Sequence, residues 1–98
     1  MITCIYFKEF DKGTLKGFAN FSLKKMGMEF FGFTFHEKDG KQWIKFPSKE
    51  YEQEGTKKYA PYFRFIEKNH YNEFQRQALE AIKNYREEKT FTLKKSWK

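Results

Sequence analysis

The chain of 98 residues carries a formal net charge of +7, and 21% of its residues are aromatic. This length predicts one domain with a modest core. The charge favours a polyanionic partner, although a lysine-rich composition without any such role would also produce it. The single cysteine, Cys4, excludes an internal disulfide, and no apolar run approaches the roughly 20 residues of a membrane helix. Because the N-terminus also lacks a signal-peptide layout, we expect a cytoplasmic protein without a membrane partner.

The first half of the chain has the patterns of antiparallel strands. Residues 2–10 are rich in β-branched and aromatic types, and residues 15–24 alternate, with Phe18 the one apolar residue on the polar side. A third strand is predicted over residues 28–37, and residues 41–46 form the returning strand. Three aromatic residues of the third strand are expected to share one face: Phe31, Phe33 and Phe35.

Turn signals separate these strands. Between the third strand and the returning strand, Asp39 and Gly40 predict a type I′ hairpin, because Gly accepts a positive φ. Residues 48–56 are polar and charged and predict a mobile loop, and residues 57–66 return to strand character. Pro61 removes an N–H donor from this last strand, so we expect an edge or a bulge there.

A C-terminal helix is predicted from about His70, with Asn69 as its N-cap, to about Glu88. Arg76 and Glu80 are spaced to pair on its exposed side. Its apolar stripe consists of Tyr71, Phe74, Ala78, Ile82 and Tyr85. Residues 89–98 are basic and predict either a disordered tail or a short extra strand. The expected fold is therefore α+β: a single domain over residues 1–88, with a twisted antiparallel sheet of four or five strands and one C-terminal helix.

Basic and aromatic residues interleave on the predicted strands. The period of two places Trp43 between Lys41 and Lys45 on one face, an arrangement that suits base stacking with phosphate contacts. On the second strand, Phe18 has Lys16 and Lys24 as basic neighbours on the same face. On the last strand, Tyr62 has Lys58 and Arg64. The alternative is that the helix, the tail or a second subunit covers these aromatic residues.

Motifs of catalysis are absent from the sequence. It contains no glycine-rich phosphate loop, no Cys/His set with metal-ligand spacing and no nucleophile elbow around Ser48. We therefore expect a protein that is not an enzyme and that holds no metal or cofactor.

The order of segments resembles the SpoVG family, also called stage V sporulation protein G or septation proteins, over about residues 2–85. The resemblance is carried by the opening strand ITCIYF, the strand KGFANFSL, and the run FFGFTFHEKDGKQWIKFPSKE with its closing Pro47, Ser48 and Lys49. The segment YAPYFRFIEKN before the helix departs from the family pattern, because it is longer and lacks a histidine. The resemblance implies a homodimer that binds DNA or RNA in gene regulation, with Arg76, Lys83 and Arg86 of the helix as binding residues.

The sequence thus predicts a non-catalytic nucleic-acid-binding protein, for which single-stranded DNA or RNA is favoured because nothing resembles a recognition helix. The predicted binding residues are Lys16, Phe18, Lys24, Lys41, Trp43, Lys45, Lys49, Lys58, Tyr62, Arg64, Arg76, Lys83 and Arg86. Two alternatives stay open: a protein-interaction module or inhibitor that uses its aromatic surface, and a small hydrolase or nuclease with an unrecognised site.

Overall fold

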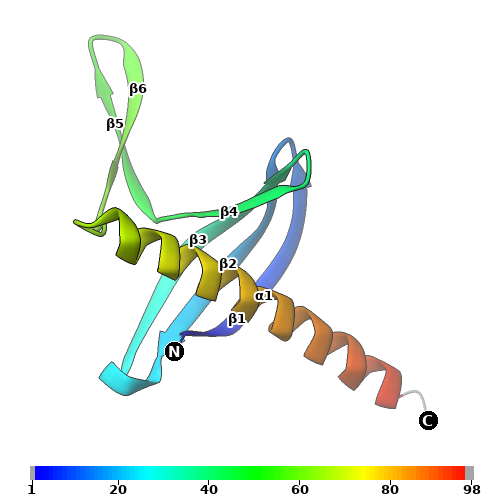
Figure 1. The fold of residues 1–98 in the computed structure, drawn as a ribbon. Helices are drawn as coiled ribbons and strands as arrows, with labels where there is room; N and C mark the ends of the chain where they lie inside the picture. Colours follow the sequence, from blue (N-terminus) through cyan, green and yellow to red (C-terminus); the bar gives the residue numbers. More distant parts are fainter. Residues whose placement is uncertain (1, 97–98) are drawn as a thin grey trace.

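The computed structural model describes the backbone of residues 2–96 and the side chains of residues 2–88. It has the predicted α+β class, with an antiparallel four-stranded sheet, a separate two-stranded hairpin and one C-terminal helix (Figure 1). The elements in chain order are β1 (Ile2–Lys12), β2 (Leu15–Leu23), the 3-10 helix η1 (Lys24–Met26), β3 (Met28–Lys38), β4 (Lys41–Lys45), β5 (Ser48–Gln53), β6 (Thr56–Pro61) and α1 (Lys68–Ser96).

The four strands of the main sheet lie in chain order, β1-β2-β3-β4, and α1 crosses one face of this sheet (Figure 1). The turn between β3 and β4 has the predicted conformation, with positive φ at both Asp39 (53°) and Gly40 (80°). Short connections of this kind hold each strand beside the next, so the sheet is a simple meander.

The core lies between α1 and the sheet. Alternate residues of the strands point toward the helix and are buried, and α1 meets them with Phe74, Ala78 and Ile82 of the predicted apolar stripe and with Ala81. Burial also raises the pKa of the Cys4 thiol to about 11, so this cysteine is a small apolar core residue. The buried apolar residues are Cys4, Ala19, Phe21, Phe33, Phe35, Ile44, Phe74, Ala78, Ala81 and Ile82.

A bulge in β3 overturns the prediction that Phe31 shares a face with Phe33. Ala19 of β2 pairs with Phe33 and Phe21 pairs with Phe30, so β3 holds one extra residue between these pairs. Gly32 adopts a φ of 87° there, and its N–H donates to Asn20 Oδ1 at 3.1 Å. Phe31 is consequently turned outward and is 59% exposed.

The predicted mobile loop over residues 48–56 is wrong, because this segment forms β5 and the turn into β6. The turn residues Glu54 and Gly55 have φ of 52° and 78°, which is again type I′ geometry. The polar composition concealed this hairpin because it has no buried face. The predicted strand over residues 57–66 ends at Pro61, and residues 62–67 continue as an irregular segment.

Helix α1 begins at Lys68, so Asn69 lies within its first turn and is not the N-cap. The pair predicted between Arg76 and Glu80 is present, at 3.5 Å. The helix ends at Ser96, beyond the predicted end near Glu88, so the short extra strand, one of the two alternatives predicted for residues 89–98, is wrong. The side chains of residues 89–98, the predicted basic tail, lie outside the described part of the chain. Within the described residues, no helix combines the length and apolar character needed to cross a membrane.

Candidate nucleic-acid interface

The sheet face that points away from α1 carries part of the predicted site. One cross-strand row on this face contains Lys8, Phe18, Thr34 and Lys45, which belong to β1, β2, β3 and β4. Ala19, Phe33, Phe35 and Ile44, which flank this row along β2, β3 and β4, point into the core, so the alternation predicted for these three strands is confirmed at this row. Phe18 packs edge to face against Phe10, with ring centroids 5.4 Å apart.

Trp43 lies on the same face and stacks on His36, its cross-strand partner in β3. The ring centroids are 5.5 Å apart and the planes differ by 7°. Hydrogen bonds to Thr34 Oγ1 (2.9 Å) and Thr14 Oγ1 (3.1 Å) fix the imidazole. Burial, and next the positive charge of Lys45, lower the pKa of His36. The indole therefore rests on a hydrogen-bonded imidazole whose neutral form is favoured.

A groove begins at Trp43 and passes around the edge of β4 toward the start of α1. Its cavity volume is 570 Å³, within the range of about 300–1,000 Å³ that small-molecule sites occupy. We call it the aromatic groove, and it is lined by Trp43, Ile44, Lys45, Phe46, Ser48, Tyr59, Pro61, Phe63, Arg64, Phe65, Ile66, Glu67, Lys68 and Tyr71.

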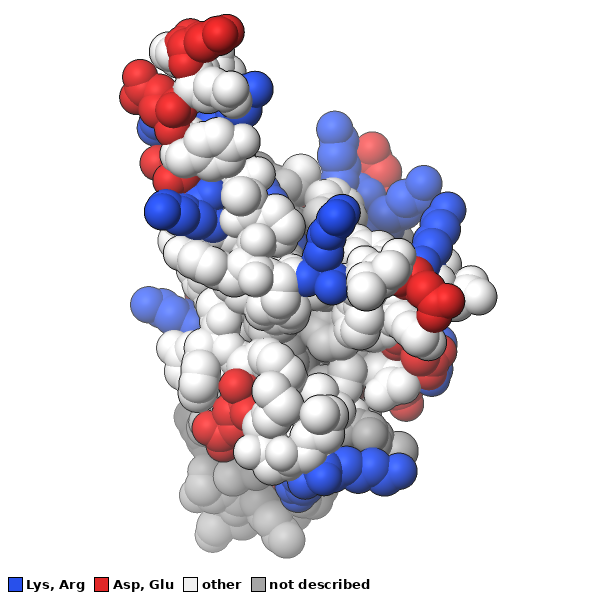
Figure 2. Space-filling view, turned by 90° about the vertical axis from the view of Figure 1, so that its left-hand side faces the viewer, with Lys and Arg blue, Asp and Glu red and all other residues white. Residues whose placement is uncertain are grey.

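The aromatic groove combines π-faces with cations. Lys45 Nζ lies 4.9 Å from the centroid of the Tyr59 ring, and Arg64 and Lys68 add two further positive charges to the lining. The one acidic residue of the lining, Glu67, lies 3.4 Å from His70 Nδ1. Figure 2 shows a broad surface of uncharged side chains with lysine and arginine residues set into it and around it, and with acidic residues at the projecting hairpin and in smaller groups elsewhere on this face. Such a surface can hold flat, apolar groups that carry negative charge.

The irregular segment after Pro61 supplies much of this groove. Phe63 reaches back to β3 and packs against Phe30 and Phe33, with centroids 5.6 and 6.1 Å apart. Phe65 packs on Phe74 of α1 at 5.5 Å. These ring contacts fix a segment that has no ladder of its own, and they place Arg64 between two anchored aromatic residues.

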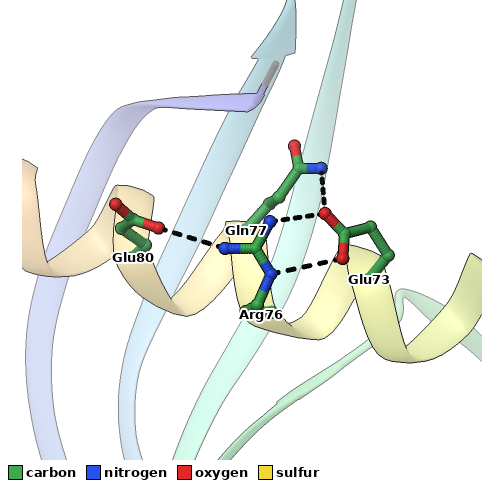
Figure 3. Close-up of polar contacts among 4 residues, drawn as sticks. All are labelled: Glu73, Arg76, Gln77 and Glu80. Atoms are coloured by element: carbon green, nitrogen blue, oxygen red, sulfur yellow. Dashed lines mark hydrogen bonds and ion pairs between the residues drawn. The ribbon is translucent and has the colours of Figure 1, made fainter.

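The basic residues predicted on the helix meet acids of the protein itself. Arg76 is paired with Glu73 and Glu80, and Gln77 also donates to Glu73 (Figure 3). The hydrogen bond from Arg76, with that from Gln77, lowers the pKa of Glu73 to about 2. Arg86 pairs with Glu9 of β1 at 2.9 Å and lies over the Phe7 ring. Both guanidinium groups are thus already paired with carboxylates of the protein.

A hollow beside α1 does bring Arg76, Lys83 and Arg86 together. Its lining also contains Glu80 and Glu87, so its charge is mixed. This hollow is less suited to a polyanion than the aromatic groove, whose lining has three cations and one acid.

The remaining predicted residues are dispersed. Lys16 is paired with Asp11 at 2.6 Å, and Lys24 belongs to η1 at the other end of β2. Lys41 is exposed beside the turn between β3 and β4, and Tyr62, 68% exposed, follows β6. The β5–β6 hairpin carries Lys49 and Lys58. Of the predicted residues, only Trp43, Lys45 and Arg64 line the aromatic groove.

Sequence reasoning missed most of the groove lining. The strand predicted over residues 57–66 would place Tyr59, Phe63 and Phe65 together on the face opposite Lys58, Tyr62 and Arg64. Pro61 was the signal in the sequence that could have corrected this, because the strand ends at the proline and the residues after it no longer alternate between two faces. Tyr71 was assigned to the helix core, yet it is exposed and lines the groove.

Within the described residues, no group of three or more His, Cys, Asp or Glu side chains could hold a metal ion. Comparisons with protein-family models, with curated proteins and with solved structures found no match. The resemblance to the SpoVG family therefore stays a prediction from the sequence.

Proposed function

We propose that this protein is a non-catalytic, nucleic-acid-binding protein that takes a single strand of DNA or RNA in the aromatic groove. The observation that carries the proposal is the convergence of Trp43, Tyr59 and Tyr71 with Lys45, Arg64 and Lys68, from four separate segments of the chain, in one groove. Unpaired bases stack on aromatic rings, each worth about 1–3 kcal/mol, while cations neutralise the phosphates.

The single-stranded form is favoured by the disposition of the helix. The inner face of α1 is buried against the sheet, and two of its arginines are paired with acids of the protein. Over the part of the helix whose side chains are described, residues 68–88, a helix held in this way has little uncompensated basic surface to enter a major groove. An exposed aromatic surface requires bases that are already unstacked, which single strands provide.

A role in gene regulation, a homodimeric state and a cytoplasmic location complete the proposal. They are supported by the resemblance to the SpoVG family and by the single, buried Cys4, which suits a reducing compartment. Size-exclusion chromatography with light scattering tests the dimer directly, and a mass of one chain contradicts it.

A second candidate function is protein interaction. Ile66 is 99% exposed, and it adjoins the groove-lining Phe63 and Phe65. An exposed aliphatic side chain beside aromatic residues is typical of a protein-binding surface. The lysines and the arginine in the same lining favour the nucleic acid over this alternative.

The test is a fluorescence anisotropy titration of labelled single-stranded DNA, duplex DNA and RNA at two salt concentrations. If Lys45, Arg64 and Lys68 each contact a phosphate, the log–log salt slope for a single strand is about −2, from about −0.7 per contact. Trp43→Ala should weaken binding by roughly 5- to 160-fold, which corresponds to one stacked base. Phe31→Ala is the matched control, because Phe31 is exposed and outside the groove lining.

Absence of binding to every nucleic acid at low salt overturns the proposed function and turns attention to a protein partner. Unchanged affinity of a folded Trp43→Ala variant removes the aromatic groove as the site.

A further inference from the structure

The β5–β6 hairpin stands away from the body of the protein (Figure 1). Apart from Ser48 at its base, all of its residues are exposed. An isolated two-stranded hairpin is at best marginally stable in water. This ribbon buries no apolar face, so its side chains are presented to solvent or to a partner.

The register of the hairpin sorts its charges between two faces. Residues directly opposite each other in an antiparallel pair point to the same side. Glu50 pairs with Tyr59 and Glu52 with Lys57, so one face holds two glutamates and a single lysine. We call this the acidic face. Hydrogen bonding confirms the geometry, because Tyr59 OH donates to Glu50 at 3.1 Å.

The other face is basic. Lys49 pairs with Ala60 and Tyr51 pairs with Lys58, and the remaining pair on this side is Gln53 with Thr56. We call it the basic face: it has no acid, and its exposed Tyr51 has Lys58 directly opposite on β6 and Lys49 two residues away on β5. Lys58 Nζ is 3.2 Å from Gln53 Oε1, a neutral partner that leaves its charge uncompensated.

The acidic face is the one turned toward the aromatic groove. Ser48, Tyr59 and Pro61 belong to the acidic side of the ladder, and all three line the groove. A polyanion that left the groove along this side would meet Glu50 and Glu52. The ribbon is narrow, since its two paired strands lie only about 5 Å apart, so a flexible nucleic-acid strand can pass around its edge to the basic face.

We propose that the basic face of the hairpin, through Lys49, Tyr51 and Lys58, binds the phosphate backbone of the strand where it continues beyond the aromatic groove. This inference rests on the proposed function and extends it, because it makes the hairpin a second contact region of the same ligand. The lysines neutralise phosphates, and Tyr51 between them offers a ring to one base. The acidic face sets the side on which the strand passes.

The test compares single strands of about 5 and about 16 nucleotides, near the two ends of the usual range of site sizes. The short strand occupies the groove alone, and the long strand also reaches the hairpin. Lys49→Ala/Lys58→Ala should weaken binding of the long strand and make its salt slope shallower by about 1.4, from about 0.7 per lost contact. Binding of the short strand should not change.

Glu50→Gln/Glu52→Gln is the matched double variant on the opposite face, and it should not weaken either complex. Trp43→Ala should weaken both. If Trp43→Ala weakens binding while the double lysine variant binds the long strand with unchanged affinity and slope, the hairpin proposal is overturned and the groove stands. If the wild-type protein binds neither strand, the proposed function fails and the hairpin proposal with it. Circular dichroism of each variant verifies the fold.

Discussion

The side-chain amide of Gln75 forms two hydrogen bonds with the backbone of Ile44. Ile44 N–H donates to Gln75 Oε1 at 2.8 Å, and Gln75 Nε2 donates to the Ile44 carbonyl at 2.7 Å. β4 is an edge strand, and its outward N–H and C=O groups at this residue would otherwise lack a partner in the ladder. The glutamine thus replaces a neighbouring strand and joins α1 to the sheet beside the aromatic groove.

Gln75→Leu should destabilise the fold, because it leaves a buried donor and acceptor at Ile44 unsatisfied. We expect the free energy of unfolding to fall by about 1–3 kcal/mol in urea denaturation. Gln42→Leu, an exposed glutamine of β4, is the control and should stay within about 0.5 kcal/mol of the wild type. Equal effects of the two substitutions would mean that the hydrogen bonds of the Gln75 side chain add nothing to the stability of the fold.

Gly17→Ala should destabilise the sheet through a steric clash. An added Cβ at Gly17 would lie 2.3 Å from Phe7 Cζ and 3.0 Å from the Lys8 carbonyl oxygen. The Phe7 ring is held by Phe35, at 5.7 Å, and by Arg86, so its displacement costs about 1–3 kcal/mol. In a Phe7→Leu background, Gly17→Ala should lower the free energy of unfolding by less. Thermal denaturation of the wild type, the two single variants and the double variant measures this difference. An equal cost in both backgrounds would contradict the clash.

Stability should decrease as the pH falls below about 6.5, in part because of His36. Burial lowers the pKa of this histidine below its ordinary value of 6.5, so the folded state favours the neutral ring and the unfolded chain binds the proton first. The stabilisation is therefore complete above the unfolded pKa and is lost as pH falls through the lowered folded pKa. Urea denaturation between pH 5 and 8 should show a weaker pH dependence for His36→Gln than for His70→Gln. The same slope in both variants would refute this origin.

The cations and the rings of the aromatic groove should affect binding differently. Arg64→Gln should make the log–log salt slope for single-stranded DNA shallower by about 0.7, because it removes one phosphate contact. Tyr71→Ala should reduce affinity and leave the slope unchanged, because a stacked base carries no counterion. Anisotropy titrations over a series of salt concentrations measure both. A shallower slope for Tyr71→Ala would show that the tyrosine acts through charge.

Local patterns were sufficient for most of the main sheet and for the inner face of the helix. The alternation around Ala19 and Phe21 and the Asp39-Gly40 pair predicted strands, faces and turn correctly, because period and turn geometry depend on neighbouring residues. The same reasoning placed Trp43 and Lys45 on the face away from the core, where the structure has them.

Only the tertiary structure decided the outward turn of Phe31, the hairpin of residues 48–61 and the aromatic groove. Phe31 turns outward because Gly32 and Asn20, in different strands, together stabilise a bulge. The hairpin has no buried face and hence no hydrophobic alternation by which to recognise it. The groove joins Trp43, Arg64 and Tyr71 from three segments, and the packing of Phe63 and Phe65 that brings them together depends on contacts distant in sequence. A single sequence determines its periodicities, but the meeting of separate segments is set by how their side chains pack.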